Sequence, residues 1–363
     1  MSLADVCRFN PTAGGTTDWT YSSTVQGYQS PALANVQNGL SYRLRAESAD
    51  LSQWEISTGA YTSSTGTFAR TTVLYNSAGT GSAPGQSGAG TPISFSAAPQ
   101  VAVIALAEDF REVLQAARTY YVATTGSDSN NGLSSAAPFL TIQHAIGVVS
   151  GLDFGAGTNV TIQLAAGTYN GGVTVGSPFV GSGTVTILGS TSSPSSCVVN
   201  NASGSAIYVG GGAKLSVSGI TVTATSGHGM VAYGTGSTLT IAGTCGFGAV
   251  SLSHLTAQVS ANILVTANTN IAGAAQYHWD AETGGVIIDQ AHTITITGTP
   301  AFSGAFAYAN YGAMFVNANT FSGAATGSRY SSTANGLIQT FGSGASYLPG
   351  STAGSTSNGG LYV

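Results

Sequence analysis

The chain has 363 residues, a formal net charge of −5, and charged side chains at only 6% of its positions, against roughly 25% in a typical soluble protein. After Arg118 the only basic residues are Lys214 and Arg329, too few to neutralise a run of phosphates, which argues against a nucleic-acid partner. No apolar run reaches the ~20 residues that span a bilayer, so membrane insertion is not expected.

Residues 1–106 contain strand-length apolar pieces separated by turn clusters rich in glycine, serine and asparagine. This pattern predicts a small all-β domain without an active site. The expected strands are residues 17–21, 40–44, 54–56, 68–74, 93–95 and 101–106.

Residues 107–118 predict a short helical neck. Phe110, Val113, Leu114 and Ala117 fall on one stripe at helical spacing, and Glu108 favours the positive N-terminus of a helix. The predicted helix, residues 107–117, would either pack on its own domain or associate with copies of itself at a three-fold axis.

Residues 119–328 predict a long series of short strands that follows a first strand, a polar turn cluster and one short helix near residues 141–149. Glycine, asparagine, serine or threonine separates the strands, and no crossover helices intervene, which excludes a doubly wound sheet. A sandwich or a barrel is possible, but three-residue strands with glycine-rich corners favour a β-solenoid. The short helix would cap its first coil, and the tail, residues 329–363, would cover its last.

The stretch from residue 121 to residue 146 resembles the opening of pectin-lyase-like parallel β-helix proteins. This resemblance implies a right-handed parallel β-helix. The matching residues are Tyr121, Val122, Gly126, Asp128, Gly132, Pro138, Phe139, Thr141, Ile142, Gln143, Ala145 and Ile146.

Two further segments resemble phage tail-fibre and tail-spike proteins. The first is an N-terminal module carried by Gly27-Tyr28-Gln29-Ser30, Tyr42-Arg43-Leu44, Trp54-Glu55-Ile56, residues 58–62, residues 68–74, Ile93 and Phe95, although Ser57 and Thr58 stand where a glycine is more usual. The second is a closing segment carried by Asn335, Gly336, Ile338, Thr340, Gly342, Leu348, Pro349, Gly350, Gly354, Gly359, Gly360 and Tyr362.

These resemblances imply a virion subunit, a tail fibre or tail spike, that recognises polysaccharide on the host surface. The N-terminal domain would attach to other virion proteins, and the chain would form a homotrimer. A polysaccharide depolymerase and a purely structural head fibre or decoration protein remain alternatives. Because the N-terminus lacks a secretory signal, we expect synthesis in the host cytoplasm and a final place on the virion.

The sharpest candidate site is the run from Tyr277 to Glu282. Asp280 and Glu282 are two residues apart, so on a strand they would share a face, and glycoside hydrolysis requires two carboxyl groups. Asp289 is a third candidate for catalysis. The candidate sugar contacts are Tyr277, His278, Trp279, Tyr308 and Tyr311. Sugar contact without cleavage, and a polar loop in which the tryptophan packs and the acids are solvated, remain alternatives to catalysis.

The sequence predicts neither a metal nor a cofactor. The five histidines are too dispersed to form a ligand motif, and the three cysteines, Cys7, Cys197 and Cys245, lie too far apart for a zinc site or a disulfide framework. We expect the thiols to be free and buried.

Overall fold

The computed structural model describes residues 2–83, 90–106 and 109–363, which form two compact units, residues 1–111 and 112–363. The first unit is an antiparallel sheet in the order β3-β7-β1-β2-β5-β4-β6, and β3 also pairs with β4, so six strands close on themselves. Its core contains Phe9, Trp19, Tyr42, Leu44 and Phe68. The strands are β1 (Arg8–Pro11), β2 (Trp19–Thr24), β3 (Ser41–Glu47), β4 (Trp54–Thr62), β5 (Thr67–Phe68), β6 (Thr72–Asn76) and β7 (Gln100–Ile104).

The predicted small all-β domain is confirmed, with two local differences. The expected strand 68–74 is split into β5 and β6 at Arg70, whose side chain turns inward, and residues 93–95 form no strand beyond an isolated bridge between Phe95 and Gly15. The backbone of Ile93 instead donates a hydrogen bond to the Glu55 carboxylate.

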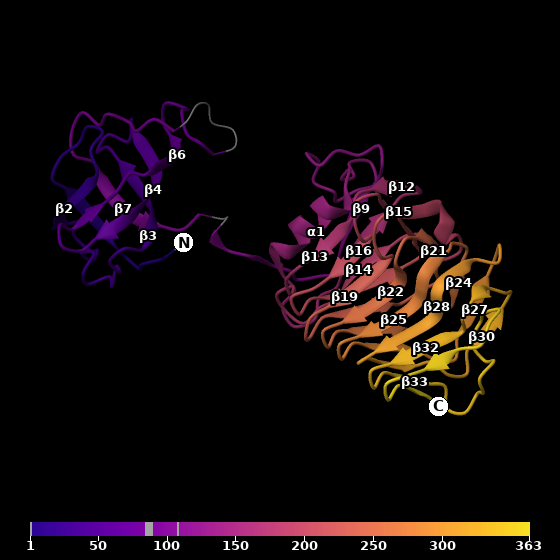
Figure 1. The fold of residues 1–363 in the computed structure, drawn as a ribbon. Helices are drawn as coiled ribbons and strands as arrows, with labels where there is room; N and C mark the ends of the chain where they lie inside the picture. Colours follow the sequence, from indigo (N-terminus) through magenta and orange to yellow (C-terminus); the bar gives the residue numbers. More distant parts are fainter. Residues whose placement is uncertain (1, 84–89, 107–108) are drawn as a thin grey trace. The chain divides into compact units, whose positions relative to one another are not determined.

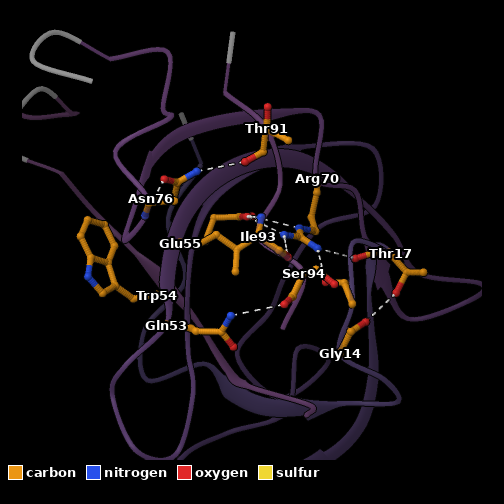
Figure 2. A network of polar contacts seen from close by, with 12 residues as sticks. Gly14, Thr17, Gln53, Trp54, Glu55, Arg70, Asn76, Thr91, Ile93 and Ser94 are labelled. Carbon is orange, nitrogen blue, oxygen red and sulfur yellow. Dashed lines mark hydrogen bonds and ion pairs between the residues drawn. The ribbon is translucent and has the colours of Figure 1, made fainter. Parts of the chain in front are cut away.

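A buried ion pair ties four segments of this unit together (Figure 2). The Arg70 guanidinium donates from Nε to Glu55 Oε1 at 2.9 Å and from Nη2 to Glu55 Oε2 at 2.5 Å. Its remaining donors reach the carbonyl oxygens of Gly15, Thr17 and Ile93, and its Cζ lies 4.1 Å from the centre of the Trp19 ring. Each hydrogen-bonding direction of the guanidinium is therefore used inside the protein.

The second unit is a parallel β-solenoid, as the sequence predicted, and Figure 1 shows its strands stacked in successive coils. Its coils contribute strands to three parallel sheets of ten, seven and nine strands. The first sheet contains β9 (Arg118–Val122), β11 (Val160–Leu164), β14 (Val185–Leu188), β17 (Lys214–Ser218), β20 (Thr238–Ile241), β23 (Asn262–Val265), β26 (Val286–Asp289), β29 (Ala313–Phe315), β33 (Leu337–Gln339) and β35 (Leu361–Tyr362).

The other two sheets begin one coil later than the first. The second sheet contains β12 (Gly167–Asn170), β15 (Cys197–Asn201), β18 (Thr221–Ala224), β21 (Cys245–Val250), β24 (Thr269–Ile271), β27 (Thr293–Ile296) and β30 (Thr320–Ser322). The third sheet contains β13 (Val173–Val175), β16 (Ile207–Val209), β19 (Met230–Tyr233), β22 (Ser253–Gln258), β25 (Ala275–Glu282), β28 (Ala301–Asn310), β31 (Thr326–Gly327), β32 (Tyr330–Thr333) and β34 (Ser355–Thr356).

The solenoid core consists of apolar side chains stacked in register from coil to coil. Because successive strand residues face opposite sides, every second residue of a regular strand enters the interior. In the first sheet one such column is aliphatic throughout and buried. It consists of Leu215, Leu239, Ile263, Ile287, Met314 and Ile338.

The helix α1 (Ile142–Ser150) lies in the first coil, close to the predicted position. Thr141 is its N-cap, accepting a hydrogen bond from the backbone of His144, and Asp128 accepts hydrogen bonds from the backbone nitrogens of Leu140 and Thr141. The buried residues of α1, Ile142, Ala145, Ile146 and Val149, join the solenoid core. The only other described helical element of this unit is the 3-10 turn η2 (Pro194–Ser196).

The predicted helix at residues 107–117 is wrong where the structure describes it; Ala107 and Glu108 lie outside the described residues. This segment contains strand β8 (Glu112–Val113), which pairs in parallel with β10 (Leu152–Asp153). Leu114 is buried in the solenoid core, whereas Phe110 and Val113 are exposed. A helix of three turns is marginal by itself, and the strand pairing and burial of Leu114 outweigh its apolar stripe.

The tail, residues 329–363, continues the solenoid where the sequence predicted a separate cap. β32, β33, β34 and β35 pair in parallel with the coils before them, and Leu348 is buried in the common core. The periodic pairing continues because the tail supplies strand residues at the same spacing as the preceding coils.

Candidate functional site

Asp280 and Glu282 share the outer face of β25, as their spacing predicted. Trp279, which precedes them, and Ala281, which lies between them, are enclosed in the core. Asp280 Oδ2 accepts a hydrogen bond from Ser253 Oγ at 2.7 Å, and Glu282 Oε2 accepts one from Gln258 Nε2 at 2.7 Å. Both partners lie on β22, the neighbouring strand of the third sheet.

The Asp280 carboxyl group is almost completely enclosed, with 3% of the residue exposed, and its Oδ1 has no hydrogen-bond partner among the described residues. Burial raises the pKa of Asp280 to about 7, and the charge of Glu282 acts in the same direction, against the hydrogen bond from Ser253. A carboxyl group with this pKa holds its proton through much of the range in which an ordinary aspartate is ionised.

Polar side chains that the sequence did not single out surround Asp280. His228 Nδ1 accepts a hydrogen bond from Thr256 Oγ1 at 2.7 Å and faces the backbone nitrogen of Ser253 at 3.3 Å. Thr256 is directly opposite Asp280 in the register of β22 and β25. Burial lowers the pKa of His228, which keeps its imidazole neutral. The only sequence signal for this group was the polar alternation of residues 253–258, which by itself gives no register.

Two pairs of tyrosines lie on the same outer face of the third sheet, one on each side of the buried Thr256. The rings of Tyr277 and Tyr308 stack with centroids 4.5 Å apart and an interplanar angle of 10°, and those of Tyr208 and Tyr233 lie 6.2 Å apart. We refer to Tyr208, Tyr233, Tyr277 and Tyr308 as the tyrosine face. Tyr311 follows β28 and is 62% exposed, near Glu282 through an isolated bridge.

The predicted contacts of His278 and Trp279 with a sugar are wrong, because both side chains are fully buried. They pack against Phe306, with ring centroids 4.9 and 5.2 Å from it. The irregular register of β25 and β28 near Ala275 turns His278 inward, so regular alternation could not reveal its direction.

Asp289 does not join the other two acids. It occupies the first sheet, in register with Val265, and is 1% exposed. Its Oδ1 lies 3.0 Å from His292 Nδ1, and burial raises its pKa to about 6 against the effect of that histidine. The prediction that Asp289 acts with Asp280 and Glu282 is therefore wrong, because Asp289 lies on the first sheet and the other two acids lie on the third.

The three cysteines are free and buried, as predicted. In the described part of the chain, no group of three histidine, cysteine, aspartate or glutamate side chains is arranged to hold a metal ion. None of the helices described has the length and apolar character needed to cross a bilayer.

Comparison of the chain with models of protein families, with curated proteins and with solved structures finds no match. The fold and the geometry of the site therefore carry the functional argument.

We expect Asp280→Asn to stabilise the solenoid at pH 8 by about 2 kcal/mol, because an amide has no charge to bury. A carboxyl group whose pKa is raised on folding stabilises the protein fully below its unfolded pKa, here 3.8, and loses that contribution as the pH rises towards 7. Denaturant unfolding at pH 8 and pH 4 measures the effect. A variant that is no more stable than the parent at pH 8 would contradict it.

Proposed function

We propose that the chain is a subunit of a phage virion fibre or spike that binds polysaccharide on the host surface. The observation that carries this proposal is the tyrosine face, where aromatic rings lie beside amide, hydroxyl and carboxyl groups on one long sheet. Aromatic rings with a polar tip suit ligands that are apolar on one face and hydroxylated at the edge. Neighbouring strands are about 4.8 Å apart, so tyrosines on adjacent strands are separated by a distance comparable to the length of a sugar ring.

The resemblance of two segments, the N-terminal module and the closing segment, to phage tail-fibre and tail-spike proteins supports the virion part of the proposal. In this proposal, the closed β-sheet unit, residues 1–111, attaches to other virion proteins, and the solenoid binds the host surface. We also propose a homotrimer, as the resemblance implies. Light scattering at micromolar protein concentration tests the assembly, and a monomer mass would contradict it.

Binding is tested by retention of the protein on bacterial surface polysaccharides, followed by sizing of the polymer. We expect retention without shortening, and we expect the Tyr277→Ala/Tyr308→Ala variant to bind about tenfold more weakly because it loses both stacked rings. Tyr28→Ala, at a 43% exposed tyrosine of the first unit, is the matched control and should bind as the parent does. Equal retention of all three proteins would contradict a role for the tyrosine face.

A depolymerase is the second candidate function, and the raised pKa of Asp280 beside Glu282 favours it. Glycoside hydrolysis combines a protonated carboxyl group with an ionised one, and burial is a known way to hold the first proton. This activity would be established if the parent protein shortens the polymer and the Asp280→Asn and Glu282→Gln variants do not. Shortening that both variants retain would exclude these residues from it.

A further inference from the structure

A cleft of about 470 Å³ opens at the first coil of the solenoid, between the start of α1 and the turn that joins β12 to β13. Thr124, Leu140, Thr168, Asn170 and Gly171 are among the residues that line it. Its size lies within the range of about 300–1,000 Å³ typical of small-molecule sites.

The cleft exists because the sheets of the solenoid begin at different coils. β9 opens the first sheet, whereas β12 and β13 are the first strands of the second and third sheets and have no strand before them. At β13 the side chain of Gln143 takes the place of a strand, with hydrogen bonds to the backbone nitrogen and oxygen of Thr174. The lining at β12 instead presents side chains to the cleft, among them Thr168 and Asn170, both exposed.

A directional chain of hydrogen bonds ends at this cleft. Thr223 Oγ1 donates to Asn200 Oδ1 at 2.9 Å, and Asn200 Nδ2 donates to Asn170 Oδ1 at 2.9 Å, so each group donates towards the first coil. Asn170 Nδ2 donates to no described residue, which leaves an amide donor at the lining of the cleft. Such a chain strengthens its last donor, because each hydrogen bond polarises the next.

The chemistry of the lining selects for an uncharged ligand. Among the residues that the structure describes, none with a charged side chain lines the cleft. Its polar side-chain groups are hydroxyls and amides, and Leu140, 41% exposed, adds an apolar surface. A buried charge on a ligand would find no counter-charge here, whereas hydroxyl and carbonyl oxygens would find the Asn170 donor and the threonine hydroxyls.

We propose that this cleft binds a small neutral polyhydroxylated ligand, of the size of one sugar residue, with an oxygen accepting from Asn170 Nδ2. This site is separate from the tyrosine face and does not depend on the proposed function. The second coil, which contains β12, would thus bind a ligand through the same hydrogen-bonded side chains that join it to the third and fourth coils.

The test is saturation-transfer NMR with N-acetylglucosamine, glucose and glucuronate as probes, on the full chain. We expect millimolar binding of the two neutral sugars and weaker binding of glucuronate. Asn170→Ala should weaken binding about fivefold through loss of one hydrogen bond, and Thr168→Trp should abolish it by filling the cleft. Asn270→Ala, at a half-buried asparagine of β24 in the same sheet, is the matched control.

Absence of saturable binding by either neutral sugar would overturn the proposal, as would binding that survives both cleft variants. The Tyr277→Ala/Tyr308→Ala variant, measured in parallel, separates the two sites. If only that variant loses sugar binding, the ligand binds the tyrosine face and the cleft proposal fails. If only the cleft variants lose sugar binding, the cleft proposal is supported, and the tyrosine face is judged by the polysaccharide experiment.

Discussion

Replacement of Arg70 by alanine is expected to destabilise the N-terminal unit by about 3–5 kcal/mol, because it leaves the fully buried Glu55 carboxylate without its counter-charge. The same change removes the contacts of the guanidinium with the carbonyl oxygens of Gly15, Thr17 and Ile93. Arg70→Lys should recover little of this loss, since an ammonium group cannot reproduce the two parallel bonds to Glu55. Denaturant unfolding monitored by tryptophan fluorescence measures the difference, with Trp19 as a reporter beside Arg70.

Arg45→Ala is the matched control for this prediction. Arg45 also pairs with a glutamate, Glu47, in the same unit, but its side chain is 43% exposed, so its loss should cost no more than about 1 kcal/mol. The double variant Arg70→Met/Glu55→Leu should lose less than either single variant, because no charge remains buried. Equal stability of Arg70→Ala and Arg45→Ala would show that the buried pair does not hold the unit together.

The second large effect expected is acid destabilisation of the solenoid by its buried histidine pair. His254 Nε2 faces the carbonyl oxygen of Gly248 at 3.0 Å and must therefore carry the proton, so His254 Nδ1 accepts from His278 Nδ1 at 3.1 Å. Burial lowers the pKa of His254 to about 3, and burial together with the neighbouring imidazole lowers the pKa of His278 well below its ordinary value. Both rings are neutral among the side chains of Phe247, Phe302 and Phe306.

A histidine whose pKa falls on folding contributes its full stability above the unfolded pKa, here 6.5, and loses it as the pH falls below that value. Protonation of each of the two should cost roughly 1.4 kcal/mol for every pH unit below 6.5, or about 3 kcal/mol at pH 4.5. Asp280 and Asp289 act in the opposite direction over the same range, because their pKa values are raised. The total pH dependence is therefore smaller than the histidine contribution.

Comparison with His278→Phe isolates that contribution. The variant loses one hydrogen bond at every pH, but its stability relative to the parent should rise by about 3 kcal/mol between pH 6.5 and pH 4.5, since it cannot take up the proton. Urea unfolding across this range gives the difference. His144→Gln, outside the buried pair, should follow the parent profile. Parallel profiles for the parent and His278→Phe would contradict the assignment.

Periodicity in the sequence predicted the architecture well where the burial of a residue depends only on which face of its strand it occupies. Short strands such as β20, β23 and β26 alternate buried and partly exposed residues, and identical spacing in neighbouring coils brings like side chains into register. Spacing of two likewise placed Asp280 and Glu282 on one face. These features depend on local backbone geometry, which one stretch of sequence contains.

The same local patterns misled wherever contacts between distant segments outweighed them. Residues 112–113 belong to a segment with an apolar stripe at helical spacing, but they form a strand that pairs with β10. The irregular register of β25 buries His278, where simple alternation would expose it. Asp289 is close to Asp280 in sequence but lies on another sheet, because the chain turns a corner between β25 and β26.

By itself, the sequence determined that this protein contains a small all-β unit followed by a β-solenoid, since strand length, turn residues and apolar alternation are local properties. Only the tertiary structure decided which polar groups meet: Ser253 and Thr256 beside Asp280, His254 against His278, and Asn170 at the end of a hydrogen-bonded chain from Thr223. Those contacts depend on the register between coils about 24 residues apart, and register follows from the packing of the whole core.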